Sequence, residues 1–344
     1  MYNKAIINIK PLGFMWETID PFLFCVHHLD HYPAGNDQMG PAALLQGRNL
    51  GQDFEIKDGW RMYHGETIPG FPAHPHRGFE TVTIVLNGFV DHSDSHGAAG
   101  RYGEGDVQWM TAGAGLQHSE MFPLIKKDEG NELELFQVWL NLPKAKKFAE
   151  PHFKMLWAED IPVYSTKDEK GKLTEVIVVA GKIGNVVATG PAPDSWAADP
   201  ANEVAMWRIK MEAGTQWTLP AASPEVRRTL YFYKGSQIRI AGLEIDPYHA
   251  IQLLADEEVI IDNGGEDGYM FMLQGLPIAE PVAQYGPFVM NTQEEIHQAI
   301  RDYRLTQFGG WPWLRHDNVH SRSKGRFAKH ADGREEEKQN PAST

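Results

Sequence analysis

The chain has 344 residues, of which 42% are hydrophobic and 23% are charged, as in ordinary soluble proteins, and it is long enough for two domains. Its 32 basic and 46 acidic residues give a net charge of −14, and so acidic a surface disfavours direct binding to nucleic acid phosphates. No apolar run approaches the roughly 18 residues that span a membrane, and the opening residues lack the apolar core of a signal peptide. We therefore expect no membrane partner and a cytoplasmic location.

The N-terminal stretch up to about Pro33 is rich in apolar residues and predicts one or two β-strands. Cys25 is the single cysteine of the chain, which rules out an intramolecular disulfide, and its apolar neighbours predict a small buried hydrophobic residue. His27, His28 and His31 crowd the same stretch. Because residues 27 and 28 of one strand face opposite ways, we do not expect them to share a metal ion.

Two pairs of metal-binding side chains, His74/His76 and His118/Glu120, are each separated by one residue. Side chains two positions apart on a β-strand point to the same face, so each pair can reach toward one point. An HxH pair alone is often two surface histidines, and the second pair strengthens the interpretation as ligands. Three imidazoles and one carboxylate would form a site for one iron, manganese, nickel, copper or zinc ion, with room for water or substrate.

The segments around these pairs predict short antiparallel strands. Thr81 to Leu86 is β-branched and aliphatic, Val107 to Met110 is mostly apolar, and glycines between them indicate hairpin turns. Pro75 cannot donate a backbone hydrogen bond, which predicts an irregular or edge strand at the first pair. The polar segment that contains His92 and His96 predicts a solvated loop, not metal ligands.

The next predicted strand, Leu133 to Leu142, alternates and is rich in aromatic residues. The pattern does not decide which of two sets faces inward, either Phe136, Val138 and Leu140 or Leu135, Gln137, Trp139 and Asn141. The basic, proline-bounded linker that follows is a natural domain boundary.

The second half of the chain repeats the all-β pattern without the metal-binding residues. His249 is the only histidine between Ala180 and Val289, and one histidine cannot reproduce a three-histidine site. The predicted strands are separated by turn residues and comprise Glu175–Ala180, Val204–Met211, Thr229–Tyr233, Gln237–Ile240, Ile251–Leu254, Val259–Ile261 and Tyr269–Leu273.

The clearest predicted helix follows these strands. Asn291 is the expected N-cap, with Glu294 reaching back as a capping box, and the apolar stripe should pack against the fold. Gly309 and Gly310 should end the helix. The stripe comprises Ile296, Ala299, Ile300 and Tyr303. The residues beyond are polar and poor in aliphatic side chains, which predicts a mostly disordered tail with Trp311 and Trp313 held against the body.

Several motifs follow one another along the chain: HPHRGFET at 74–81, QWMTAG at 108–113 followed by HSEM at 118–121, NLP at 141–143, EP at 150–151 and GPFVMNTQEEI at 286–296. These motifs resemble those of the pirin family, a branch of the cupin superfamily. The resemblance extends to about Phe308, and so long and ordered a set of matches is highly specific.

The resemblance implies an all-β bicupin, with two tandem jelly-roll-type barrels, a C-terminal helix and a flexible tail. The expected domains are an N-terminal metal-binding cupin barrel over residues 1–150, a C-terminal cupin barrel without ligands plus the helix over 151–308, and the polar tail over 309–344. A barrel without ligands would pack against its twin, shape the pocket entrance or offer a surface to a partner.

Carried over position by position, the resemblance implies metal ligands at His74, His76, His118 and Glu120. Ordinary cupins place their glutamate after the HxH pair, where this chain has Glu80, whereas pirins use the glutamate two residues after the third histidine. We therefore choose Glu120 and interpret Glu80 as a structural or hydrogen-bonding neighbour and the main rival for the fourth position. The resemblance implies Fe²⁺, with nickel, manganese, copper or zinc as alternatives.

The family is known for quercetin 2,3-dioxygenase activity, in which a flavonol is opened with loss of carbon monoxide. For this chain it implies a small phenolic substrate and O₂ as reactants, with Glu120 as both ligand and catalytic base for the substrate 3-hydroxyl. The alternative is an iron-dependent redox sensor or transcriptional co-regulator that binds a protein partner without turnover. A structural zinc ion is disfavoured because no thiolate is available.

Overall fold

The computed structural model describes residues 5–339, and 46% of the chain is in strands against 9% in helices, which confirms the predicted all-β class. The chain forms two compact units, each assembled from several stretches. The first unit comprises His27–Gln137, Lys144–Ala158 and the chain from Glu280 onward. The second unit comprises the chain up to Val26, Val138–Pro143 and Glu159–Ala279. The domain boundaries at residues 150 and 308 remain a proposal.

The second unit is a two-sheet sandwich. Its larger sheet has the order β1 (Ile6–Pro11), β21 (His249–Leu254), β18 (Arg227–Lys234), β23 (Gly268–Gly275), β16 (Ala205–Met211), β13 (Leu173–Ala180) and β12 (Val163–Lys167). Its smaller sheet has the order β17 (Gln216–Leu219), β22 (Val259–Asn263), β19 (Ile238–Ile240) and β20 (Leu243–Ile245). A separate hairpin pairs β14 (Lys182–Ile183) with β15 (Val186–Val187).

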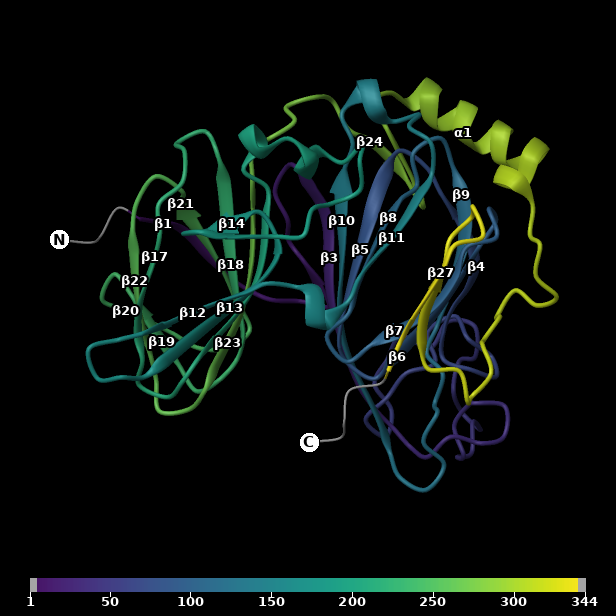
Figure 1. Cartoon of the computed structure of the whole chain (residues 1–344), viewed down its shortest axis with the longest axis horizontal. Helices are drawn as coiled ribbons and strands as arrows, with labels where there is room; N and C mark the ends of the chain where they lie inside the picture. Colours follow the sequence, from purple (N-terminus) through teal and green to yellow (C-terminus); the bar gives the residue numbers. More distant parts are fainter. Residues whose placement is uncertain (1–4, 340–344) are drawn as a thin grey trace. The chain divides into compact units, whose positions relative to one another are not determined.

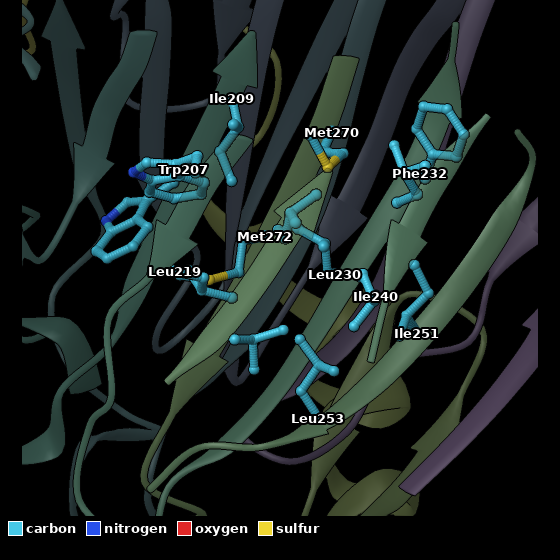
Figure 2. Packing of buried hydrophobic residues seen from close by; sticks show 14 of the residues in the cluster. Trp207, Ile209, Leu219, Leu230, Phe232, Ile240, Ile251, Leu253, Met270 and Met272 are labelled. Atoms are coloured by element: carbon cyan, nitrogen blue, oxygen red, sulfur yellow. The ribbon is translucent and has the colours of Figure 1, made fainter. Parts of the chain in front are cut away.

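The core of the second unit lies between these two sheets. Alternate residues of each strand enter it because side chains on a strand alternate between faces. Figure 2 shows Leu230 of β18 and Met272 of β23 gathered with Ile240 of the smaller sheet and Ile251 of β21, and all four are buried. Each strand predicted in this half of the chain is present in the structure.

The first unit contains the two histidine pairs. One of its sheets has the order β27 (Glu335–Lys338), β26 (Arg326–Lys329), β7 (Ala99–Gly103), β6 (Phe89–Asp94), β9 (Leu116–Met121) and β4 (Gly70–His76). The other has the order β11 (His152–Leu156), β8 (Val107–Thr111), β5 (Phe79–Asn87), β10 (Asn131–Asn141), β3 (Phe22–Tyr32) and β2 (Met15–Trp16). Strands β3 and β10 have residues in both units, and β2 belongs to the second unit. Buried residues of both sheets, such as Val85, Val90 and Leu135, form one core cluster.

Strand β10 decides between the two inward sets that the sequence left open. Leu135 belongs to the core cluster of the first unit, and the Gln137 side chain donates to Glu120 on the other sheet. The set that includes Leu135 and Gln137 therefore faces the interior. Phe136 is also fully buried, so burial alone could not have separated the two faces.

The single α-helix, α1 (Gln293–Thr306), follows the hairpin of β24 (Ala283–Tyr285) and β25 (Phe288–Met290) in the first unit. Its predicted stripe packs against the hairpin, with Ile296 and Ala299 buried, as expected. The predicted cap is wrong by one residue, because Thr292 is the N-cap and Glu295 completes the capping box. A 3₁₀ turn, Gln307–Gly309, ends the helix, and among residues 5–339 no helix is long and apolar enough to cross a membrane.

The prediction of a mostly disordered tail is wrong for the described part of the tail. Strand β26 pairs with β7 and with β27, so the yellow strands in Figure 1 extend the sheet that carries the histidines. The physical reason is a buried ion pair, since Arg326 Nη1 donates to Asp106 Oδ1 at 2.7 Å and both side chains are almost fully buried. Trp313 is held as predicted, because its Nε1 donates to the Asp94 carbonyl.

Other short 3₁₀ turns connect the strands. They are Lys144–Lys146, Ala158–Asp160, η3 (Trp196–Ala198) and η4 (Pro200–Asn202).

Candidate metal centre

The neighbouring strands β4 and β9 bring the two predicted pairs together. In their antiparallel register His74 lies opposite His118, and Phe71 lies opposite Glu120, with a register shift between residues 71 and 74. Strand β4 is also the edge of its sheet, which confirms the irregular edge strand predicted from Pro75. Gly70 permits the close approach of the strands, because a Cβ there would lie 2.5 Å from the Glu120 carbonyl oxygen.

The three histidines form a compact cluster of potential ligands. The nitrogen atoms that His74, His76 and His118 offer all lie within 4.8 Å of one another. The Nε2 atoms of His74 and His118 are 3.1 Å apart. Two imidazole nitrogens bound to one ion at about 2.1 Å, in adjacent octahedral positions, would be about 3.0 Å apart. The donor spacing therefore fits a shared divalent ion.

Hydrogen bonds orient the rings for this role. His74 Nδ1 lies 2.9 Å from the Pro72 carbonyl oxygen, so it carries the proton and leaves Nε2 with a lone pair. His118 is fully buried, and its Nδ1 atom has no hydrogen-bond partner among the described residues. The two facing Nε2 atoms are spaced as an N–H···N hydrogen bond or as two ligands of one ion would be.

Burial also sets the protonation of the cluster. It lowers the pKa of His74 from 6.5 to about 4, although the hydrogen bond to Pro72 opposes the shift. Burial and the neighbouring histidines hold the pKa values of His76 and His118 well below the usual range. Neutral imidazoles are the form that binds metals, so the cluster is ready to accept an ion near neutral pH.

Glu120 lies beside the cluster but is held by other side chains. Its Oε2 atom is 3.7 Å from His118 Nε2. Thr83 Oγ1 donates to Glu120 Oε1 at 3.0 Å, and Gln137 Nε2 donates to Oε2 at 2.7 Å. Burial raises the pKa of the Glu120 carboxyl, while His92 and these hydrogen bonds partly oppose the shift. The carboxylate is thus oriented and more basic than an exposed one.

Glu80, the rival for the fourth position, lies on β5 in the other sheet. It is fully buried, and Thr111 Oγ1 on the paired strand β8 donates to its Oε1 at 2.7 Å. The compact group of potential ligands found among residues 5–339 contains the three histidines without Glu80 or Glu120. The choice of Glu120 as the fourth ligand stays a prediction.

The segment with His92 is not the solvated loop that the sequence predicted. Residues 89–94 form β6, which pairs with β9, and His92 is fully buried opposite Glu120. Its ring stacks on Phe153 and lies 5.6 Å from that of His118. Paired strands satisfy the backbone groups of this polar run, and polar residues such as Asp91 and Asp94 are buried with it. Only His96, at the turn, is exposed as predicted.

Sequence reasoning missed the side chains that position Glu120. Thr83 lies in a predicted strand, and Gln137 belongs to one of the two sets that could face inward on the strand from Leu133 to Leu142. Their contacts with Glu120 depend on the register between strands that are distant in the sequence. The alternation within each strand was the one signal available.

The helix holds the segments that flank the histidines. Arg77, next to His76, donates through Nη1 to Asp302 of α1 at 2.6 Å. Tyr303 of α1 donates to the side-chain oxygen of Gln117, next to His118, at 2.9 Å. The apolar stripe thus packs against the fold, while Asp302 beside it and the hydroxyl of Tyr303 within it position the ligand-bearing strands.

The histidines of β3 have structural partners. His27 Nε2 lies 3.0 Å from Glu134 Oε1, whereas His28 Nδ1 lies 2.7 Å from the Tyr63 hydroxyl. Tyr63 in turn donates to Asp30 Oδ2 at 2.6 Å, so His28 is the donor in its own hydrogen bond. The two side chains have separate partners, in agreement with the prediction that they do not share an ion.

His28 is expected to make the protein less stable in mild acid. Burial, followed by the charges of Arg61 and His27, lowers its pKa from 6.5 to about 3. Because the folded pKa lies below the unfolded one, its stabilising contribution is complete above pH 6.5 and is lost as the pH falls toward 3. Between about pH 8 and about pH 5 the loss is about 2 kcal/mol. Urea unfolding should show that His28→Gln loses about 2 kcal/mol less than the unaltered chain over this interval, and equal losses would contradict this assignment.

Comparison with known proteins agrees with this architecture. The family profile described as Pirin matches residues 15–140, and the Pirin C-terminal cupin domain matches residues 206–309. A Pseudomonas aeruginosa protein named "Putative quercetin 2,3-dioxygenase" is 37% identical over 240 residues, which are 70% of this chain and 79% of that protein. Human pirin is 35% identical over 253 residues, which are 72% of this chain and 80% of that protein.

A solved structure is also similar. The crystal structure of a quercetin 2,3-dioxygenase from Acinetobacter baumannii matches with a TM-score of 0.69 at 27% identity, and the match covers 89% of this chain and 99% of the other. The two cupin domains and the level of identity to curated pirins lead to one conclusion: this chain belongs to the pirin family.

Proposed function

We propose that this protein is a metal-dependent dioxygenase that acts on a flavonol such as quercetin, with O₂ as the second reactant. The observation that carries the proposal is the buried cluster of His74, His76 and His118 with the oriented carboxylate of Glu120 beside it. The similarity to the quercetin 2,3-dioxygenase of Acinetobacter baumannii supports the same reaction class.

The proposed metal ligands are His74, His76, His118 and Glu120. Nitrogen and oxygen donors without thiolate suit Fe²⁺, which we propose as the native ion, and they also accept nickel, manganese, copper or zinc. When bound, the ion would supply electrophilic activation of the phenol and redox chemistry toward O₂.

The partly exposed side chains beside the cluster support one direction of approach for a substrate. His76 and His118 are buried, whereas His74 is partly exposed. Gln137, which orients Glu120, is also partly exposed. We infer that the substrate reaches the site on the side of His74 and Gln137, where its hydroxyl can meet the carboxylate.

Glu120 is the proposed general base. A carboxyl whose pKa is raised by burial accepts a phenolic proton more readily than an exposed carboxylate. Thr83 and Gln137 keep its two oxygens in fixed directions, which reduces the entropy lost when the substrate binds. Glu120 would take the proton from the 3-hydroxyl of the flavonol.

Glu120→Gln is expected to lower quercetin-dependent oxygen uptake by a factor of about 10²–10⁴, because an amide cannot take the proton. The uptake should be measured per bound metal ion, so that a loss of turnover is separated from a loss of metal. Glu80→Gln is the matched control, since Glu80 is equally buried but bonds to Thr111. Unchanged turnover per ion in Glu120→Gln would contradict the role of Glu120 as base.

A further inference from the structure

The second unit contains a cavity of about 370 Å³ that the proposed metal chemistry does not use. It is lined by the hairpin β14–β15, the turns η3 and η4, and residues of β16, β18 and β23. The walls are mainly apolar and include Ile183, Val187, Val204, Trp207 and Pro220. Its volume is within the range of small-molecule sites.

One charged side chain in this lining is almost completely buried. Arg228 is 1% exposed, and its Nε atom donates to Gln274 Oε1 at 2.8 Å. The register places Arg228 directly opposite Gln274, and Gln274 opposite Ala205, so the three residues form one row across β18, β23 and β16. The Nη1 atom of Arg228 is buried without a hydrogen-bond partner among the described residues.

The charge of Arg228 is not neutralised by an ion pair with any residue between 5 and 339. Glu203 is close enough to favour the charged guanidinium, but its carboxylate accepts from the Ser223 hydroxyl and, at 3.3 Å, from the Ser223 backbone N–H. Asp199, also in the lining, accepts from the Ala201 backbone N–H at 2.9 Å. Burial lowers the pKa of Arg228 only to about 10, so the group is charged at neutral pH.

A second unpaired donor lies on the same face of the sheet. Trp207 is 3% exposed, and its indole Nε1 atom has no partner among the described residues. It follows Ala205 by two positions on β16 and therefore shares the face of the row that contains Arg228. Figure 2 shows Trp207 at the side of the core cluster, next to Ile209. A buried donor without a partner is unfavourable, and a ligand with acceptor oxygens would supply the missing hydrogen bond.

We propose that this cavity of the second barrel binds a small organic monocarboxylate with an apolar, preferably aromatic, body. The carboxylate would accept from Nη1 of Arg228 and from Nε1 of Trp207, and the body would lie against the aliphatic and proline walls. A guanidinium and a carboxylate form the strong charge-assisted hydrogen bonds that such a buried cation requires. This site is independent of the metal and of the reaction proposed above.

Binding can be tested with cinnamate and cinnamamide on the full-length protein, by calorimetry and by tryptophan fluorescence. The two probes share the aromatic body and differ in charge. Three variants separate the contributions of charge, guanidinium geometry and cavity volume to binding. Arg228→Met removes the cation, and Arg228→Lys keeps a charge but loses the planar guanidinium group. Ala198→Trp fills the cavity from an exposed position of its lining. Arg239→Met, at an exposed ion pair of the same unit, is the matched control.

Cinnamate is expected to bind saturably and at least about tenfold more tightly than cinnamamide, because the charged hydrogen bonds are made by the carboxylate alone. Arg228→Met and Ala198→Trp should each weaken cinnamate binding at least about tenfold. Arg228→Lys should weaken it less than Arg228→Met does. The control, Arg239→Met, should leave the affinity for cinnamate unchanged. If Arg228→Met fails to fold, Ala198→Trp and the comparison of cinnamate with cinnamamide decide. Equal binding of the two probes, absence of saturable cinnamate binding, or full binding in Ala198→Trp would overturn the proposal.

Discussion

Replacement of His118 by alanine is expected to abolish metal retention. His118 is fully buried, and its Nε2 lies 3.1 Å from that of His74, so the substitution removes one of the three clustered nitrogen donors. His76→Ala should have the same effect, because only two imidazoles would remain. Metal content should be measured after anaerobic loading with Fe²⁺ and gel filtration, with a native value near one ion per chain and values near zero for both variants.

Two controls make this result specific. His64→Ala removes an exposed histidine outside the cluster and should leave the metal content unchanged. Glu80→Ala should also retain the ion, because the Glu80 carboxylate pairs with Thr111 on the other sheet. Loss of the ion in Glu80→Ala, together with its retention in Glu120→Ala, would show that Glu80 is the fourth ligand.

Arg101→Met is expected to destabilise the protein by about 3–5 kcal/mol, the usual result of removing one partner of a buried ion pair. Arg101 and Asp91 are almost fully buried, and two parallel hydrogen bonds of 2.7 Å join them. Arg101 also donates through Nη1 to the carbonyls of Ser321 at 2.9 Å and Lys324 at 2.7 Å. The substitution therefore leaves a buried carboxylate without its cation and releases the tail.

Urea unfolding and limited proteolysis measure the two effects separately. Arg239→Met, at an exposed pair with Glu244, is the control and should cost less than about 1 kcal/mol. In Arg101→Met, a protease should first cleave the segment between α1 and β26, because this part of the tail loses its contacts with Arg101. If Arg101→Met is no less stable than Arg239→Met, the tail is not held by this ion pair.

Strands with strong local patterns could be predicted from the sequence. Residues 204–211 and 229–233 are rich in apolar and aromatic side chains between clear turns, and the structure has β16 and β18 there. The short strands β14, β15 and β20 were missed because two or three residues carry no period. The helix was found from its stripe, but Thr292 and Glu295 offer the same capping chemistry one residue later than the predicted Asn291 and Glu294.

Polar sequences were misinterpreted where their partners are distant in the chain. His92 lies in a run of polar residues that looks like a loop, yet the run pairs on both sides and is buried. The tail also appeared to be disordered, because the Arg326–Asp106 pair joins residues that are far apart in the sequence. Likewise, the pairs at 74/76 and 118/120 were visible, whereas the support of Glu120 by Gln137 depends on how two sheets face each other.

Oxygen uptake after anaerobic Fe²⁺ loading tests the proposed dioxygenase most directly. The purified protein should be loaded with increasing iron, the bound metal determined in parallel, and oxygen consumption followed with and without quercetin. We predict uptake that requires quercetin, rises in proportion to bound iron and disappears in His118→Ala. Stoichiometric iron without quercetin-dependent oxygen uptake would contradict the proposed dioxygenase activity. It would favour an iron-dependent sensor that acts by binding another protein.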